Sequence, residues 1–184
     1  MVEITKKQLP EIWISAEKAK SYLTDIDIKL YISNSNEVNA YTFGFIKPYT
    51  IVLHSALINL MTPDEIQAVI GHEMGHILFG HTKLNTIIRS SKSFLGDVIF
   101  YKWSRSAEFS ADGIAWVASG KDTKTVVSSF LRLLTGTKKN INVEEYLKQS
   151  DTVFEKISPD SILRTHPDIR KRILNILELE KKKL

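Results

Sequence analysis

The sequence predicts an α+β fold, in which a small three-stranded sheet near the N-terminus is followed by a mostly helical half. Two observations lead to this prediction. Short apolar segments bounded by turn residues lie in the first third of the chain, and helix-period patterns dominate from there to the end. Strands grouped early and helices grouped late are typical of α+β domains rather than of alternating α/β folds.

The first elements are a helix and three strands. We expect the helix over residues 10–23, although its apolar residues follow helical spacing only loosely, and the strands over residues 28–32, 38–45 and 50–53. The first strand alternates apolar and polar residues. The other two flank Ile46-Lys47-Pro48-Tyr49, whose composition indicates a turn and therefore a hairpin.

A longer helix is predicted over residues 63–79. Thr62 fits its N-cap, Pro63 its first position, and Glu65 the third residue of a capping box. Gly80 is a suitable terminator. Apolar residues recur along it at helical spacing and predict a broad buried flank, namely Ile66, Val69, Ile70, Met74, Ile77 and Leu78.

The remaining pattern is helical. A segment over residues 84–103 is followed by a helix that we expect to start near Ser104, and further helices are expected over 123–134, 143–148 and 168–181. The small residues Ala107, Ala111 and Ala115 suit close packing of the helix that starts near Ser104.

Length and composition predict one globular domain over residues 1–184. The chain is 43% hydrophobic and 25% charged, which is ordinary for a domain of this size. The sheet and the helix of residues 63–79 should occupy about 25–82, and the later helices about 104–184. Because the chain has no Cys, any metal must be held by His and carboxylate side chains.

The strongest chemical signal is His72-Glu73-Met74-Gly75-His76, inside the helix of residues 63–79. A helix turns about 100° per residue, so His72 and His76 return to nearly one face and can share a metal ion. Glu73 then lies beside the metal, where it can act as a general base toward a metal-bound water. The motif predicts one Zn²⁺ per chain.

A zinc hydrolase needs a third protein ligand. His81 is expected to point away from the other two, as a helix-ending residue favoured by the helix dipole, with a place bordering the site as the alternative. Glu108 and Asp112 are better candidates, because they are four residues apart on one helical face. We predict that Glu108 binds zinc and that Asp112 accepts the free ring N–H of His72.

With these residues the chain resembles the gluzincin peptidases of the HtpX and CaaX prenyl endopeptidase group. Four segments in the same order carry the resemblance, which spans about residues 28–173: 39–44, 72–76, 108–112 and 165–167. It implies a zincin-like fold and a zinc-dependent endopeptidase that hydrolyses extended peptides with a metal-activated water. Peptides or proteins would then be the substrates.

The resemblance also implies roles for three further residues. Asn39 and Ala40 match the edge strand beside the family's cleft, to which an extended peptide can add as another strand. His166 matches a histidine near the active site, which we expect to donate a hydrogen bond to the oxyanion. The alternatives are a plain strand-to-turn segment for the first pair and a surface histidine at the start of the last helix for His166.

Many relatives carry membrane helices, but no segment here approaches the ~20 apolar residues of a spanning helix. The N-terminus does not resemble a signal peptide. Residues 94–103 are apolar but short, and we expect them to form a lid or wall of the site, with interfacial membrane contact as the alternative. The expected location is cytoplasmic, with a peripheral membrane location as the alternative.

The net charge of +4 raises the question of nucleic acid, but the basic runs at 138–139 and 181–183 are short, so no nucleic-acid partner is expected. The oligomeric state is left open. Two other functions compete with a peptidase that works in solution. One is a zinc-stabilised latent or inactive peptide-binding module, and the other is a peripheral membrane peptidase that uses residues 94–103.

Overall fold

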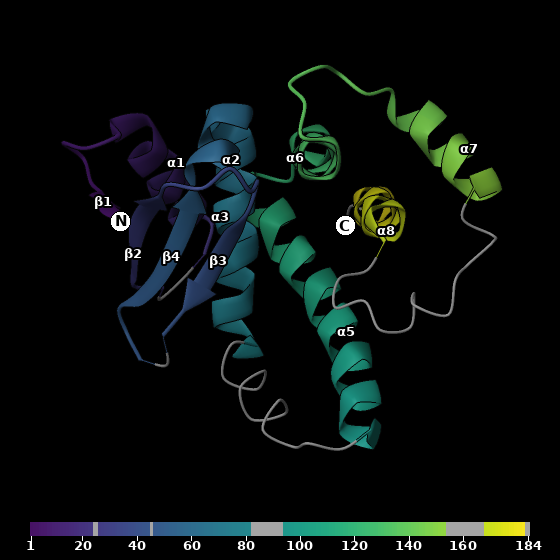
Figure 1. Ribbon diagram of the computed structural model, residues 1–184, viewed down its shortest axis with the longest axis horizontal. Helices are drawn as coiled ribbons and strands as arrows, with labels where there is room; N and C mark the ends of the chain where they lie inside the picture. The colour runs from purple at the N-terminus through teal and green to yellow at the C-terminus, as the bar shows by residue number, and fades with distance from the viewer. Residues whose placement is uncertain (24–25, 45, 82–93, 154–167, 183–184) are drawn as a thin grey trace.

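A computed structural model describes residues 1–23, 26–44, 46–81, 94–153 and 168–182; along 94–102 and 150–153 it describes the backbone alone. The architecture is α+β, as predicted, with a small sheet at one side and helices over the rest (Figure 1).

The sheet has four strands, not the three that we expected, in the order β1-β2-β4-β3. The strands are β1 (Val2–Ile4), β2 (Ile28–Ser33), β3 (Ala40–Phe43) and β4 (Tyr49–His54). β4 runs parallel to β2 and antiparallel to β3, so the predicted hairpin is confirmed. The missed strand, β1, pairs antiparallel with β2. At three residues it is too short to show an alternating pattern.

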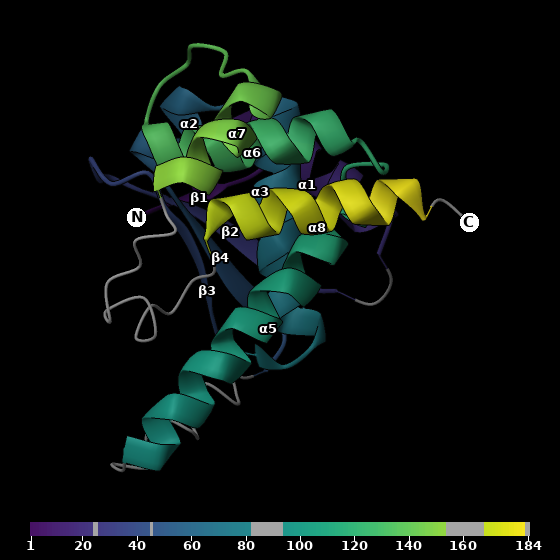
Figure 2. The same cartoon turned by 90° about the vertical axis from the view of Figure 1, so that its right-hand side faces the viewer.

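The helices in the described part of the chain are α1 (Pro10–Ser21), α2 (Ser55–Leu60), α3 (Pro63–Leu78), α5 (Phe94–Ala118), α6 (Thr123–Thr135), α7 (Val143–Val153) and α8 (Ile169–Lys181). α3 is central: it contacts β3 and β4 on one side and α5 on the other (Figure 1). α8 lies between α6 and the C-terminal part of α5 (Figure 2). α2 was not predicted.

Two clusters of buried apolar side chains hold these layers together. The larger joins the inner face of the sheet to α1 and α3, with Ile51, Leu53 and Ile70 fully buried. The smaller joins α5, α6 and α8 around Trp116 and Phe130. α3 contributes to both clusters, so its two flanks are fixed from opposite sides.

The start and end of α3 are those that the sequence predicts. The Thr62 hydroxyl accepts from the Glu65 backbone N–H, while the Glu65 carboxylate accepts from the Thr62 N–H, which completes the capping box. Gly80 has φ +66°, a conformation that L-residues rarely adopt, and it turns the chain out of the helix.

α3 and α5 approach each other very closely because small residues line their contact. A Cβ added to Gly75 would lie 2.8 Å from the backbone Cα of Ala111, and one added to Gly71 would lie 2.5 Å from the Cβ of Ala118. The predicted close packing through Ala111 is therefore confirmed. This approach determines how near the side chains of α5 come to those of α3.

The helix start that we expected near Ser104 is wrong, because α5 runs without a break from Phe94 to Ala118. The serine does not cap a helix here, since the preceding residues are themselves helix-compatible and no proline interrupts them. The apolar segment 94–103 is thus the first part of α5. Its role as a lid or membrane contact stays a prediction, because the side chains of 94–102 lie outside the description.

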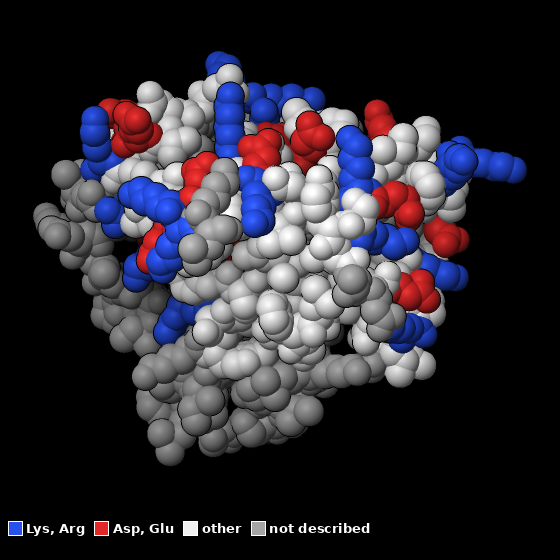
Figure 3. Space-filling view, turned by 180° about the vertical axis from the view of Figure 1, so that it is seen from behind, with Lys and Arg blue, Asp and Glu red and all other residues white. Residues whose placement is uncertain are grey.

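Among the described helices, none combines the length and apolar composition needed to cross a membrane. On the face that Figure 3 views, Lys and Arg side chains are interspersed with Asp and Glu.

Candidate active site

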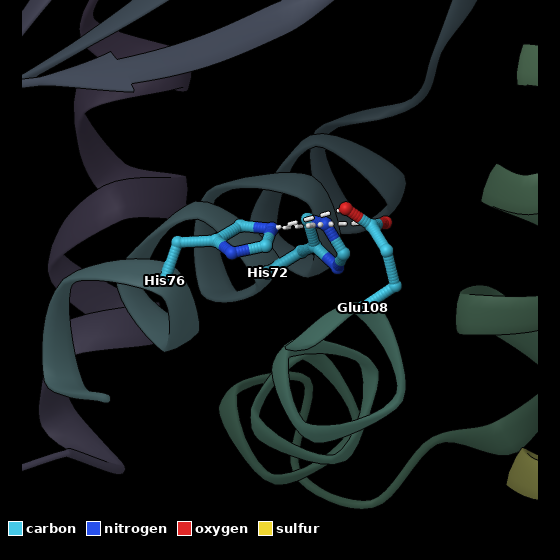
Figure 4. Close-up of side chains that lie close together, drawn as sticks. All are labelled: His72, His76 and Glu108. Carbon is cyan, nitrogen blue, oxygen red and sulfur yellow. Dashed lines mark hydrogen bonds and ion pairs between the residues drawn. The ribbon is translucent and has the colours of Figure 1, made fainter. Parts of the chain in front are cut away.

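Three side chains from two helices converge at the α3–α5 contact. His72 Nε2 lies 3.1 Å from His76 Nε2. Glu108 reaches across from α5 and places Oε2 3.5 Å from the His72 nitrogen and Oε1 3.5 Å from the His76 nitrogen. Figure 4 shows the two rings and the carboxylate pointing toward one another. The structure therefore brings these three residues together, as the sequence predicts.

These three side chains are close enough together to hold one metal ion. Ligand atoms about 2.0–2.1 Å from a tetrahedral metal lie about 3.3 Å from one another. The two Nε2 atoms, 3.1 Å apart, are close to that value, and a carboxylate oxygen of Glu108 lies within 4.8 Å of both. Two neutral imidazoles and a carboxylate are also a donor set that suits zinc and leaves a fourth position for water or substrate.

The first of these candidate ligands, His72, is oriented by a buried ion pair. Its Nδ1 lies 2.9 Å from the Asp112 carboxylate, as predicted, and that carboxylate is held bidentately by Arg172 at 2.6 and 2.8 Å. Nδ1 therefore donates its proton to Asp112, so that in the neutral ring the Nε2 lone pair is directed at Glu108 and His76.

The electrostatics of this cluster call for a positive charge at its centre. Burial alone lowers the pKa of His72, but hydrogen bonds and charges from Asp112 and Glu108 outweigh it and raise that pKa to about 10. Burial alone would raise the pKa of Asp112, yet the charge of Arg172 and the bonds from His72 and Arg172 lower it. Either a proton on His72 or a metal ion can supply the positive charge that the carboxylates favour.

The second candidate ligand, His76, has a partner that we expected to face away. His81 Nδ1 lies 3.0 Å from His76 Nδ1 and borders the cleft, so the prediction that His81 points elsewhere is wrong. The helix ends before His81, and the turn at Gly80 brings the ring back. Burial and the charge of His76 lower the pKa of His81 to about 4, so the ring is neutral and can accept the His76 Nδ1 proton.

The predicted base, Glu73, is nearly buried on the same helix, with 8% of its surface exposed. The hydroxyl of Thr42, on β3, donates a hydrogen bond of 2.6 Å to Glu73 Oε2. The edge strand is thereby joined directly to the candidate catalytic carboxylate.

A cleft of about 380 Å³ is lined by the three candidate ligands and by Thr42, Glu73, His81 and Arg172, whereas Asp112 is fully buried. Asn39 and Ala40 line it, as expected from the resemblance, and β3 is the edge strand of the sheet. Its other walls are apolar side chains of α2, α3 and α6, among them Leu57, Val69, Phe130 and Leu133. His166, the predicted oxyanion donor, lies outside the described residues.

We did not predict from the sequence that Arg172 belongs to the site. A signal for it was present, because Ile169, Arg172, Ile173 and Ile176 share the spacing of one helical face, and three of these four are apolar. A charged residue on such a face is usually buried against a partner of opposite charge.

A model of Peptidase family M48 matches the chain twice, over residues 11–101 and 89–180. The plastoglobule-localized metallopeptidase 48 of Arabidopsis thaliana is 31% identical over 175 residues, which cover 85% of this chain and 50% of that protein. Protease HtpX of Glaesserella parasuis is 34% identical over 115 residues, or 60% and 38% of the two chains. A CAAX prenyl protease 1 homolog of Arabidopsis thaliana is 42% identical over 64 residues, or 34% and 15%.

The chain thus spans half or less of the length of these relatives. The two matches to the family model nevertheless extend together from residue 11 to residue 180. On this ground, and in agreement with the resemblance to HtpX and CaaX prenyl endopeptidases, the chain belongs to peptidase family M48.

Proposed function

We propose that this chain is a zinc-dependent endopeptidase that hydrolyses extended peptides, and that residues 1–184 form one zincin-like domain. The observation that carries the proposal is the convergence of His72, His76 and Glu108 in one cleft, with a ligand atom of each within 4.8 Å of the others. Membership of a peptidase family supports a peptide or protein as the substrate. In the described residues, no feature favours the inactive binding module or the membrane peptidase.

In this proposal His72, His76 and Glu108 hold one Zn²⁺, which when bound polarises the scissile carbonyl and lowers the pKa of water from ~15.7 to about 7. Glu73 takes a proton from the attacking water and delivers it to the leaving nitrogen as the C–N bond breaks. Asp112 and His81 keep the two histidines in the tautomers that present Nε2.

The substrate would lie along β3. The backbone groups of an edge strand can pair with an extended peptide, and Asn39 and Ala40 place such a peptide within the cleft. His166 remains the predicted donor to the oxyanion.

The test is Glu73→Gln, which keeps the size of the side chain but removes its basicity. We expect the variant to bind zinc at one ion per chain, measured by metal analysis, and to lose cleavage of a peptide library by ~10²-fold or more, as removal of a general base does. Cleavage by the variant at the parent rate would disprove the mechanism. A parent chain that binds no zinc would disprove the metal site.

A further inference from the structure

The edge strand and the candidate base are joined by one short hydrogen bond. The Thr42 hydroxyl lies 2.6 Å from Glu73 Oε2, and the two residues are 31 positions apart in the chain. Both side chains line the cleft, and Glu73 is 8% exposed. A hydroxyl that donates to a nearly buried carboxylate makes a charge-assisted bond, which is shorter and stronger than one between neutral groups.

This bond leaves the two oxygens of Glu73 unequal. Among the described residues Thr42 engages Oε2, so Oε1 is the oxygen that we expect to take a proton from water. The bond also limits rotation of the carboxylate about its last torsion, which is broad and poorly restrained in a free glutamate. A base whose reactive oxygen is held in one place needs less reorganisation in the transition state.

The backbone of Thr42 faces the position that we propose for the substrate. The His54 N–H donates to the Asn39 carbonyl, so the backbone of Asn39 is directed toward β4. In an antiparallel pair the direction alternates, so Ala40 and Thr42 direct their backbone groups to the open edge. Thr42 therefore directs its backbone groups to the open edge of β3 and its side chain to Glu73.

We propose that Thr42 is a positioning residue that orients Glu73 for proton transfer and links this orientation to the binding of a peptide strand at the β3 edge. The inference rests on the proposed function, since it gives Glu73 the role of base. It adds a residue outside the metal ligands and outside the Asn39-Ala40 pair.

The experiment compares Thr42→Val, which keeps the shape and the strand preference but lacks the hydroxyl, with Thr42→Ser, which keeps the hydroxyl. Steady-state cleavage of a peptide selected with the parent chain gives kcat and KM separately. We expect Thr42→Val to lower kcat by about 10-fold while KM changes little, because the edge backbone is intact. Thr42→Ser should restore most of the lost kcat.

Thr50→Val is the matched control. It makes the same exchange on β4, opposite Phe43 and outside the cleft, and its kcat should equal that of the parent. Zinc content and the thermal midpoint are measured for every variant, and Thr42→Ala replaces Thr42→Val if the latter does not fold.

The inference is overturned if the zinc-loaded Thr42→Val variant has a kcat equal to or above that of the parent, or if Thr42→Ser is as slow as Thr42→Val. A zinc-loaded parent that cleaves no peptide is a different result. It rejects the proposed function itself and removes the inference with it.

Discussion

His72 is a largely buried imidazole held between two carboxylates, and this couples its protonation to the metal binding that we propose. Without a metal, its pKa is raised to about 10, so it carries a proton at neutral pH. Zinc requires the neutral ring. The proton that stabilises the metal-free fold is fully present below the ordinary histidine pKa of about 6.5, and its contribution is lost as the pH rises through about 10.

We therefore expect zinc binding to release about one proton from His72 at pH 7, so that the apparent affinity rises by up to tenfold per pH unit in the neutral range. Isothermal titration calorimetry in two buffers of different ionisation enthalpy counts the protons released. Binding with no proton release near pH 7 would contradict the assignment.

For single residues of the candidate site, the sequence predicted the positions of those whose partners lie within one helical turn. His72, Glu73 and His76 follow from helical geometry alone. Glu108 and Asp112 could be paired with them because their own spacing defines a face. His81 could not, since its position depends on a turn at Gly80 that breaks the helical phase.

At the scale of elements, the site depends on the close crossing of α3 and α5. The crossing is close because Gly75 lies against Ala111 with no room for a methyl group. Separating the helices would carry Glu108, which is one turn from Ala111, away from both histidines.

Gly75→Ala should therefore destabilise the fold by ~1–2 kcal/mol, the cost of overpacking less the better helix propensity of alanine, and should weaken zinc binding. Urea unfolding and competition with a zinc chelator measure the two effects. Gly113→Ala is the control, because a Cβ there meets nothing closer than Leu179 Cδ1 at 3.9 Å. Equal stability of the two variants would argue against the role of the crossing.

The elements that the sequence predicted best are those with local signals. α3 begins at a capping box and ends at a glycine, and both are visible in the sequence. β1 was missed because it exists only through pairing with β2, and the start of α5 was misplaced because a serine inside a helix looks like a cap.

At the scale of the whole molecule, Arg172 joins three helices that are distant in sequence. From α8 it holds Asp112 of α5, 60 residues away, and its Nη1 lies 3.4 Å from Glu108. The guanidinium also lies over the ring of Phe130, at 4.5 Å, which adds a contact to α6. The helical spacing around Arg172 indicates that its side chain is buried, but no periodicity relates it to Asp112 or Glu108, so its partners could not be derived from the sequence.

Among the described residues, Arg172 and His72 are the cationic partners of Asp112. Replacing Arg172 with Met should therefore leave a buried charge uncompensated and lower the free energy of unfolding by ~3–5 kcal/mol. Lys171→Met, at the exposed neighbouring position, should change stability by less than ~0.5 kcal/mol. The free energy of unfolding in urea, with zinc chelated, separates the two. If Arg172→Met lowers the free energy of unfolding as little as Lys171→Met does, Arg172 is not needed for the fold.

The dependence of His72 on a residue of α8 has a consequence for biosynthesis. A ribosome makes α3 and α5 before it makes residue 172, so a growing chain holds both histidines and Glu108 while the guanidinium that compensates Asp112 is still missing. If the chain is the peptidase proposed above, we expect the nascent polypeptide to acquire hydrolytic competence only after α8 has emerged and docked, which would spare neighbouring unfolded chains from premature cleavage during translation.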